Sequence, residues 1–77
     1  MRKSYKHGVR FEEAVEVFLD PFYQEGDASD NNEERNFILG YSLSQRLLLV
    51  VYVERQTRNR IISARLATKS ERRLYEQ

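Results

Sequence analysis

The chain has 77 residues, of which 40% are hydrophobic and 32% are charged. This length fits one small domain over residues 1–77, near the lower limit at which a single hydrophobic core holds a fold together. With no cysteine and one histidine, the sequence excludes a disulfide framework, a thiol nucleophile and zinc sites built from cysteines or several histidines.

The formal net charge of +1 conceals an uneven distribution. Residues 1–40 hold 5 basic and 9 acidic residues, whereas residues 41–77 hold 8 basic and 3 acidic residues. An ordinary solvated surface is one interpretation, and a positive face on the second half is the other. No apolar stretch approaches the roughly 18 residues of a membrane helix and no signal segment opens the chain, so we expect a cytoplasmic protein without a membrane partner.

Helical signals occupy the first part of the chain. Residues 1–7 look like the last turns of a helix, because Lys6 and His7 supply cations there and Gly8 follows where a left-handed cap is favoured. A second helix, ended by Pro21, is indicated by apolar residues at helical spacing. These apolar residues are Phe11, Ala14, Val15, Phe18 and Leu19. The glutamates beside them are interpreted as a solvated face.

Residues 24–34 are predicted to form an exposed loop, since Ala28 is their only apolar residue. The acidic residues of this segment lack the spacing of a calcium-binding loop. Alternating apolar residues then predict a first strand over residues 37–41, which a turn over Ser42–Gln45 follows.

Two further strands are predicted on either side of a polar connection over Gln56–Asn59. Residues 47–53 are apolar throughout, as in a strand in the middle of a sheet, and residues 60–66 form the last strand. A capping-box pattern starting at Thr68 predicts a short helix over residues 69–77. Because strands joined by short turns are antiparallel, the expected fold class is α+β: a small antiparallel sheet with helices packed on one face.

The last two strands are predicted to pair with Arg55 opposite Arg60. Alternation then gives an apolar face toward the helices, formed by Leu49, Val51, Val53, Ile62, Ala64 and Leu66. The solvent-facing side would carry Val50, Tyr52, Glu54, Ile61, Ser63 and Arg65. A phenol, a carboxylate and a guanidinium would then lie close enough to act together. The plain alternative is an antiparallel sheet with one ordinary wet face.

Such a group is suited to RNA cleavage without a metal ion. RNA carries its own nucleophile, the 2′-hydroxyl, so a protein needs to move protons and to stabilise the negative charge around phosphorus. The planar guanidinium of arginine binds two phosphate oxygens at once, and glutamate, histidine, lysine or tyrosine can move protons. His7 is equally explained as a cation that complements a helix end. The basic residues of the last helix could likewise bind phosphates or form a solvated face.

Several short motifs stand in a fixed order along nearly the whole chain. They are Lys6-His7-Gly8-Val9, Phe11-Glu12-Glu13-Ala14, Val17-Phe18-Leu19-Asp20-Pro21, Glu34-Arg35, Gly40, the run from Leu49 to Arg55, the run from Arg60 to Arg65, Ala67-Thr68, Glu71-Arg72 and Tyr75-Glu76. In this order and spacing they resemble the BrnT toxin family.

The resemblance implies an endoribonuclease toxin of a type II toxin–antitoxin pair, with a RelE-like fold and no cofactor. The implied partners are RNA and a ribbon-helix-helix antitoxin, through which the complex binds operator DNA. Family members usually begin with a further strand, and its lack would leave a sheet edge open to pairing with a second copy or another chain. The alternative function is a non-catalytic, degenerate toxin-like module that only binds an antitoxin.

Apart from Lys69, which is chosen for the basic character of the last helix, the candidate site residues occupy positions that match the family. The predicted catalytic residues are Arg65, Glu54, His7 and Tyr52. The predicted RNA-binding residues are Arg35, Arg55, Lys6, Lys69, Arg72 and Tyr75. The arginines would bind phosphate, and His7, Glu54 and Lys6 would transfer protons. The two tyrosines would stack on a base or donate a hydrogen bond. No metal-binding residue is predicted.

Overall fold

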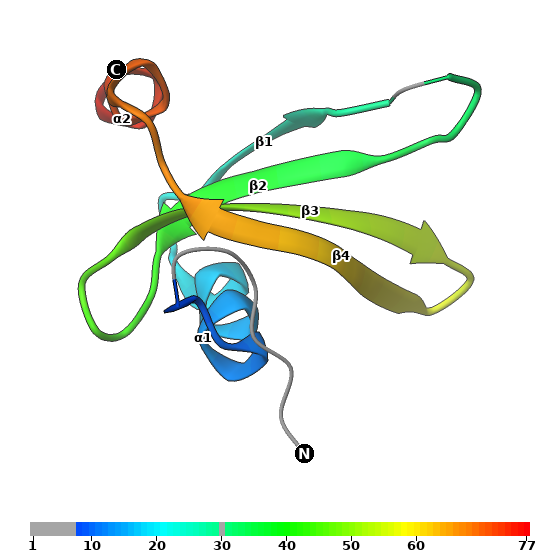
Figure 1. The fold of residues 1–77 in the computed structure, drawn as a ribbon, viewed down its shortest axis with the longest axis horizontal. Helices are drawn as coiled ribbons and strands as arrows, with labels where there is room; N and C mark the ends of the chain where they lie inside the picture. Colours follow the sequence, from blue (N-terminus) through cyan, green and yellow to red (C-terminus); the bar gives the residue numbers. More distant parts are fainter. Residues whose placement is uncertain (1–7, 30) are drawn as a thin grey trace.

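The structure, a computed structural model, describes residues 8–29 and 31–77. The helix predicted for residues 1–7 lies outside the described residues. Four antiparallel strands form one sheet in the order β1–β2–β3–β4 (Figure 1). The strands are β1 (Gln24–Asp27), β2 (Asn36–Tyr41), β3 (Leu47–Arg55) and β4 (Arg58–Leu66). The helices are α1 (Phe11–Glu16), continued by the 3₁₀ turn η2 (Val17–Leu19), and α2 (Lys69–Glu76). The predicted α+β class is therefore confirmed.

β1 lies where the sequence predicted a loop, so that part of the prediction is wrong. This strand has no apolar alternation, and it is held by its pairing with β2, which places Gly26 opposite Phe37. A Cβ atom at Gly26 would lie 2.6 Å from the Phe37 ring, so the ring occupies the space that a side chain would take. Because the strand is held by its pairing with β2 and has no apolar pattern of its own, its residues alone do not reveal it.

The core lies between α1 and one face of the sheet, which we call the α1 face. Buried side chains of this face are Ile38, Leu48, Val50, Tyr52 and Ala64, and they pack against Val9, Ala14 and Val17. Side chains alternate along a strand, so the residues between them point to the other side. We call that side the open face, and it carries Phe37, Leu49, Val51, Val53 and Arg65.

The predicted apolar stripe of the first helix is only partly confirmed. Ala14 is buried, and Phe18 packs at the margin of the core. Phe11, Val15 and Leu19 remain 42%, 41% and 69% exposed. Polar contacts on the other side of α1 hold the helix in a different rotation from the predicted one. In this orientation Val17 lies in the core, and Phe11, Val15 and Leu19 lie at the surface.

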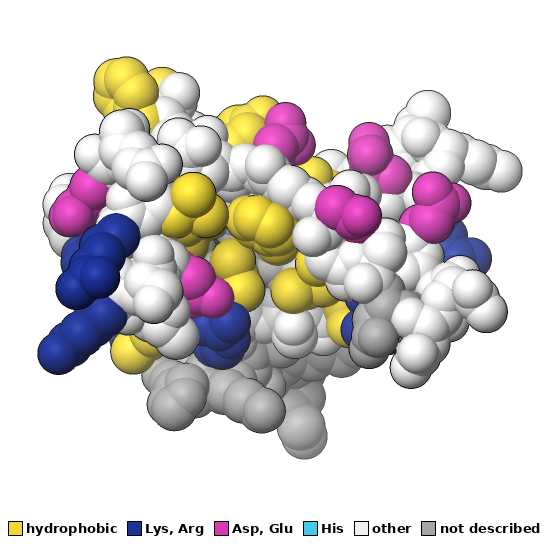
Figure 2. Space-filling model, turned by 90° about the horizontal axis from the view of Figure 1, so that it is seen from above, with side chains coloured by type: hydrophobic (Ala, Val, Ile, Leu, Met, Phe, Trp, Pro, Cys, Tyr) yellow, Lys and Arg dark blue, Asp and Glu magenta, His cyan; other side chains and the backbone are white. Residues whose placement is uncertain are grey.

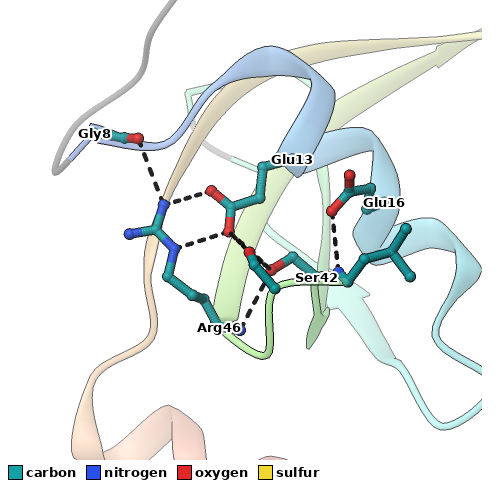
Figure 3. Close-up of polar contacts among 7 residues, drawn as sticks. Gly8, Glu13, Glu16, Ser42 and Arg46 are labelled. Atoms are coloured by element: carbon teal, nitrogen blue, oxygen red, sulfur yellow. Dashed lines mark hydrogen bonds and ion pairs between the residues drawn. The ribbon is translucent and has the colours of Figure 1, made fainter.

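Those contacts join Glu13 to the turn between β2 and β3 (Figure 3). Glu13 pairs with Arg46, whose Nε donates to the carboxylate at 2.8 Å, and it accepts hydrogen bonds from Ser42 and Ser44 at 2.8 and 2.9 Å. Glu16 accepts from the backbone N–H of Leu43 at 3.0 Å. The interpretation of these two glutamates as a solvated face is therefore wrong, because they fasten α1 to the turn.

The connection between β3 and β4 is shorter than predicted. It consists of Gln56 and Thr57, so Arg55 pairs with Arg58 and not with Arg60. Gln56 has a φ of 53°, in the left-handed region that tight hairpin turns use. The predicted register is therefore wrong by two residues at the hairpin end.

A β-bulge changes the register again farther along β4. Tyr52 pairs with Ile61, whereas the preceding Val51 pairs with Ser63. Ile62 is thus an extra residue in β4, and side chains beyond it swap faces relative to plain alternation. The bulge brings Ala64 onto the α1 face and turns Arg65 to the open face.

The predicted assignment of faces is consequently wrong for β3. The structure turns Val50, Tyr52 and Glu54 toward the α1 side, and it turns Leu49, Val51 and Val53 toward the open side. The physical reason is that residues 47–53 are apolar at every position, so hydrophobicity gives no preference for either face.

The two helices contact opposite faces of the sheet, whereas both were expected on one. Gly40 of β2 faces the α1 side, because a Cβ atom at this position would lie 3.1 Å from Val17. Its neighbour Tyr41 points the other way, and its ring contacts Tyr75 of α2 edge to face, with ring centroids 5.3 Å apart. The open face is therefore covered at the α2 end and exposed toward the hairpin.

Candidate functional site

Four arginines of the β3–β4 hairpin lie on the open face. Arg60 pairs with Val53 and Arg65 with Leu49, and both partners belong to this face. Arg55 and Arg58 lie opposite each other two residues farther toward the turn, which keeps them on the same side. The bulge at Ile62 is what adds Arg65 to this row, which thus runs from the hairpin turn to α2.

Three of these arginines have free guanidinium groups within the described ranges. Arg55, Arg58 and Arg60 are exposed and make no hydrogen bond or ion pair with another described residue. Three unpaired cations within residues 55–60 create a strongly positive end of the hairpin. Such a group attracts a polyanion, since unpaired guanidinium groups bind phosphate oxygens readily.

Arg65 differs, because its guanidinium is already held. Its Nη1 and Nη2 donate to the two carboxylate oxygens of Glu71 at 2.8 and 2.7 Å. Nη1 also donates to the backbone carbonyl of Leu66 at 3.2 Å. The ion pair lowers the pKa of Glu71 and raises that of Arg65. Both side chains therefore stay charged and joined at neutral pH.

α2 adds further positive charge beside Arg65. Lys69, Arg72 and Arg73 are exposed on this helix, and Arg72 donates to the Tyr41 hydroxyl at 3.1 Å. Figure 2 views the molecule from the side on which α2 lies, and basic side chains gather at its left end. Hydrophobic side chains occupy the middle of that view. The half-buried apolar residues of the open face are Phe37, Leu49, Val51 and Val53.

A cleft of about 1480 Å³ opens between the hairpin and the segment over residues 32–36. The predicted residues Arg35, Glu54 and Arg55 line it, together with Arg58 and Arg60. Arg35 pairs with Glu33 of the same segment. The cleft therefore brings three predicted site residues together and adds two arginines that were not predicted.

Tyr52 does not lie on the open face. Its side chain is buried on the α1 face, where its ring meets Phe18 edge to face at a centroid distance of 5.2 Å. Burial and the nearby carboxylate of Glu25, 3.5 Å from the hydroxyl, raise the pKa of Tyr52. The predicted sharing of one open face by Tyr52, Glu54 and Arg65 is therefore wrong.

Tyr75 is fixed and not free to stack on a base. Its hydroxyl donates to Asp20 at 2.6 Å, and burial together with this carboxylate raises the pKa of Tyr75 to about 12. Asp20 also accepts from the backbone N–H groups of Phe22 and Tyr41 at 2.9 and 2.8 Å. These contacts give Tyr75 a role in docking α2 against the sheet.

Three residues of this surface, Arg58, Arg60 and Glu71, are not among the site residues predicted from the sequence. Arg58 lies in the predicted connection and Arg60 directly after it, and the sequence does not show that the turn has only two residues. Glu71 is predicted only as part of the helix cap. The predicted residues Lys6 and His7 lie outside the described residues. Within the described ranges, no group of three or more His, Cys, Asp or Glu side chains could hold a metal ion. No helix of that part is long and apolar enough to cross a membrane.

Comparison with known proteins gives one assignment. A family model described as the ribonuclease toxin BrnT of type II toxin–antitoxin systems matches residues 2–71. No curated protein matches the chain. The match spans nearly all of the described fold, including the arginine row of the hairpin and the first turn of α2. The chain therefore belongs to the BrnT family of ribonuclease toxins of type II toxin–antitoxin systems.

Proposed function

We propose that the protein binds single-stranded RNA along the open face and cleaves it without a metal ion. Membership of the BrnT family makes RNA the substrate and an antitoxin the partner. The observation that supports the location is the bulge at Ile62, which aligns Arg65 with Arg58 and Arg60 on one exposed side. Phosphates would follow this row, and bases would lie on the apolar strip of the same face.

The proposed chemistry uses the 2′-hydroxyl of RNA as the nucleophile. This oxygen bonds to the adjacent phosphorus, the bond to the 5′-oxygen breaks, and the products carry a 2′,3′-cyclic phosphate and a 5′-hydroxyl. One proton leaves the 2′-hydroxyl and one reaches the 5′-oxygen. Glu54 turns toward the α1 side, yet it lines the same cleft as Arg55, Arg58 and Arg60, and it is the proposed proton acceptor there. Arg35 and the hairpin arginines would stabilise the charge around phosphorus, and His7 and Lys6 remain proposed proton-transfer groups.

The antitoxin is proposed to be a ribbon-helix-helix protein that acts in the cytoplasm. Among residues 8–29 and 31–77, α2 covers the open face at one end only, so a partner that lies over Val51 and Val53 would also cover the neighbouring arginines. Neutralisation then follows from exclusion of RNA. Operator DNA would be bound through the antitoxin.

The test is RNA cleavage by the purified protein in the presence of EDTA. We expect cleavage of a single-stranded RNA to persist in EDTA and to fall at least about tenfold in a variant carrying Arg58→Ala and Arg60→Ala. Arg10→Ala, at the cap of α1, removes the same charge away from the open face and serves as the control. Loss of cleavage in EDTA, with recovery on adding a divalent metal, would contradict the proposal.

A second candidate function is a binding module without catalysis. It is favoured by one observation: Arg65 lies on the open face, whereas Glu54 and Tyr52 turn toward the other side. Under this alternative the protein binds only its antitoxin, and RNA stays intact over the whole assay.

A further inference from the structure

We propose that Glu71 is a positioning residue, which holds the Arg65 guanidinium so that its free edge receives a phosphate of RNA. The inference rests on the proposed function, because it concerns how one arginine of the open face is oriented for RNA. Glu71 itself does not touch the substrate. Its carboxylate binds one edge of the Arg65 guanidinium and affects the substrate only by orienting that group.

The donors of Arg65 are divided between two edges. Glu71 takes one hydrogen from each of Nη1 and Nη2, and the Leu66 carbonyl takes the second hydrogen of Nη1. Nε–H and the second hydrogen of Nη2 remain, and they have no partner within the described part of the chain. These two hydrogens lie on one edge of the planar group and form a fork that matches two phosphate oxygens.

Glu71 is itself fixed by the cap of α2. One of its oxygens accepts from the backbone N–H of Thr68 at 2.9 Å, while the Glu71 N–H donates to the Thr68 hydroxyl at 3.2 Å. The Glu71 side chain is 22% exposed and that of Arg65 is 36% exposed, so the pair is partly shielded and still reachable. The first turn of α2 therefore determines the direction of the guanidinium.

A held arginine binds phosphate at a lower entropic cost than a mobile one. An unpaired arginine loses much of its rotamer freedom when it binds, whereas Arg65 has already lost that freedom in the folded protein. Charge alone predicts the opposite effect of Glu71, because a carboxylate beside RNA repels the phosphates. The direction in which the RNA affinity changes when Glu71 loses its charge therefore distinguishes positioning from simple repulsion.

The experiment measures affinity for a single-stranded RNA in which 2′-O-methyl groups prevent cleavage. We expect Glu71→Gln to bind this RNA about tenfold more weakly at low salt, although the variant carries one negative charge fewer. Glutamine still suits the capping position. In an Arg65→Ala background the same substitution should cause no further loss, or a slight gain.

Ser70→Gly is the matched control. It lowers the helix propensity of the first turn of α2 but leaves the contacts of Thr68 and Glu71 in place, so α2 loses stability and the ion pair stays. We expect its RNA affinity to equal that of the unchanged protein. A loss as large as that of Glu71→Gln would show that stability of α2 is the cause and would overturn the inference.

A readout without RNA completes the test. In the unchanged protein, the Nε–H of Arg65 should give a distinct NMR signal with slow rotation of the guanidinium, and Glu71→Gln should average it. If Glu71→Gln leaves the affinity unchanged or raises it, while Arg65→Ala lowers it, the positioning role is wrong and the proposed RNA face stands. If Arg65→Ala has no effect on the affinity, the placement of RNA at this end of the face fails as well.

Discussion

Single side chains in this protein have roles that depend on the contacts they meet in the fold. Glu13 was interpreted as solvated, yet it is the centre of the contacts that fasten α1 to the β2–β3 turn. Its carboxylate pairs with Arg46, and this hydrogen-bonded ion pair lowers the pKa of Glu13 to about 2. Only the tertiary structure brings Arg46 to it, since 33 residues separate the two.

The Glu13 contact predicts acid sensitivity. In the unfolded chain Glu13 has its usual pKa of 4.5 and in the folded chain a pKa of about 2, so its stabilising contribution is complete above pH 4.5 and is lost as the pH falls toward 2. With allowance for the partly exposed Arg46, we expect the loss to be about 2 kcal/mol. Urea unfolding at several pH values measures it.

Glu13→Gln supplies the comparison for that measurement. The variant should be less stable at neutral pH and should lose less stability than the unchanged protein between pH 4.5 and 2. Glu76→Gln, at the exposed end of α2, is the control and should keep the original pH dependence. An unaltered acid profile in Glu13→Gln would refute the assignment.

At the scale of the element, β4 and α2 show how small local features direct the site. One extra residue in β4 turns Arg65 to the open face. The capping box of α2 was predicted from the sequence and is present, and it places Glu71 against that arginine. The helix has no buried residue of its own, so its position depends on a few specific contacts.

The contact of Tyr75 with Asp20 is the one that we expect to hold α2 in place. Tyr75→Phe keeps the ring against Tyr41 but removes the 2.6 Å hydrogen bond, which should cost about 1–2 kcal/mol. Thermal unfolding, together with faster amide exchange confined to α2, measures the effect. Tyr23→Phe, at a side chain that is 40% exposed, is the control.

The same contact also has a signature at alkaline pH. The folded pKa of Tyr75 is raised to about 12 from 10.0, so its contribution is complete below pH 10 and is lost as the pH rises toward 12. The unchanged protein should therefore lose stability in this range more steeply than Tyr75→Phe. Equal slopes in the two proteins would argue against the contact.

At the scale of the whole molecule, the charge asymmetry of the sequence becomes a difference between the two sides of a sheet. The acidic first half supplies α1 and its contacts with the turn, whereas the basic second half supplies the arginines of the open face. The positive and negative formal charges nearly balance over the chain, but the hairpin arginines lie on the part of the open face that α2 does not cover. A protein of nearly neutral charge can therefore present a local surface for a polyanion.

This distribution predicts a strong dependence of RNA binding on salt. If about four arginines contact phosphates, log K should fall with log salt concentration with a slope of about −3. Arg58→Ala together with Arg60→Ala should reduce the magnitude of the slope by roughly 1.4. Arg10→Ala, at the cap of α1, should leave it unchanged. A slope that does not respond to the hairpin variants would place the RNA elsewhere.

The sequence by itself determined the features that depend on neighbours in the chain. These are α2 with its capping box, the β2–β3 turn, the hairpin of β3 and β4, and the α+β class, since caps, turns and apolar runs are local patterns. The match to the BrnT family likewise follows from the order of residues. Tertiary structure alone decided which face of β3 meets α1, because a run that is apolar at every position fits either side. It also decided the formation of β1 and the bulge at Ile62, because the pairing and packing of neighbouring strands are not contained in the apolar pattern of a single strand. This pairing turns Arg65 outward and Tyr52 inward.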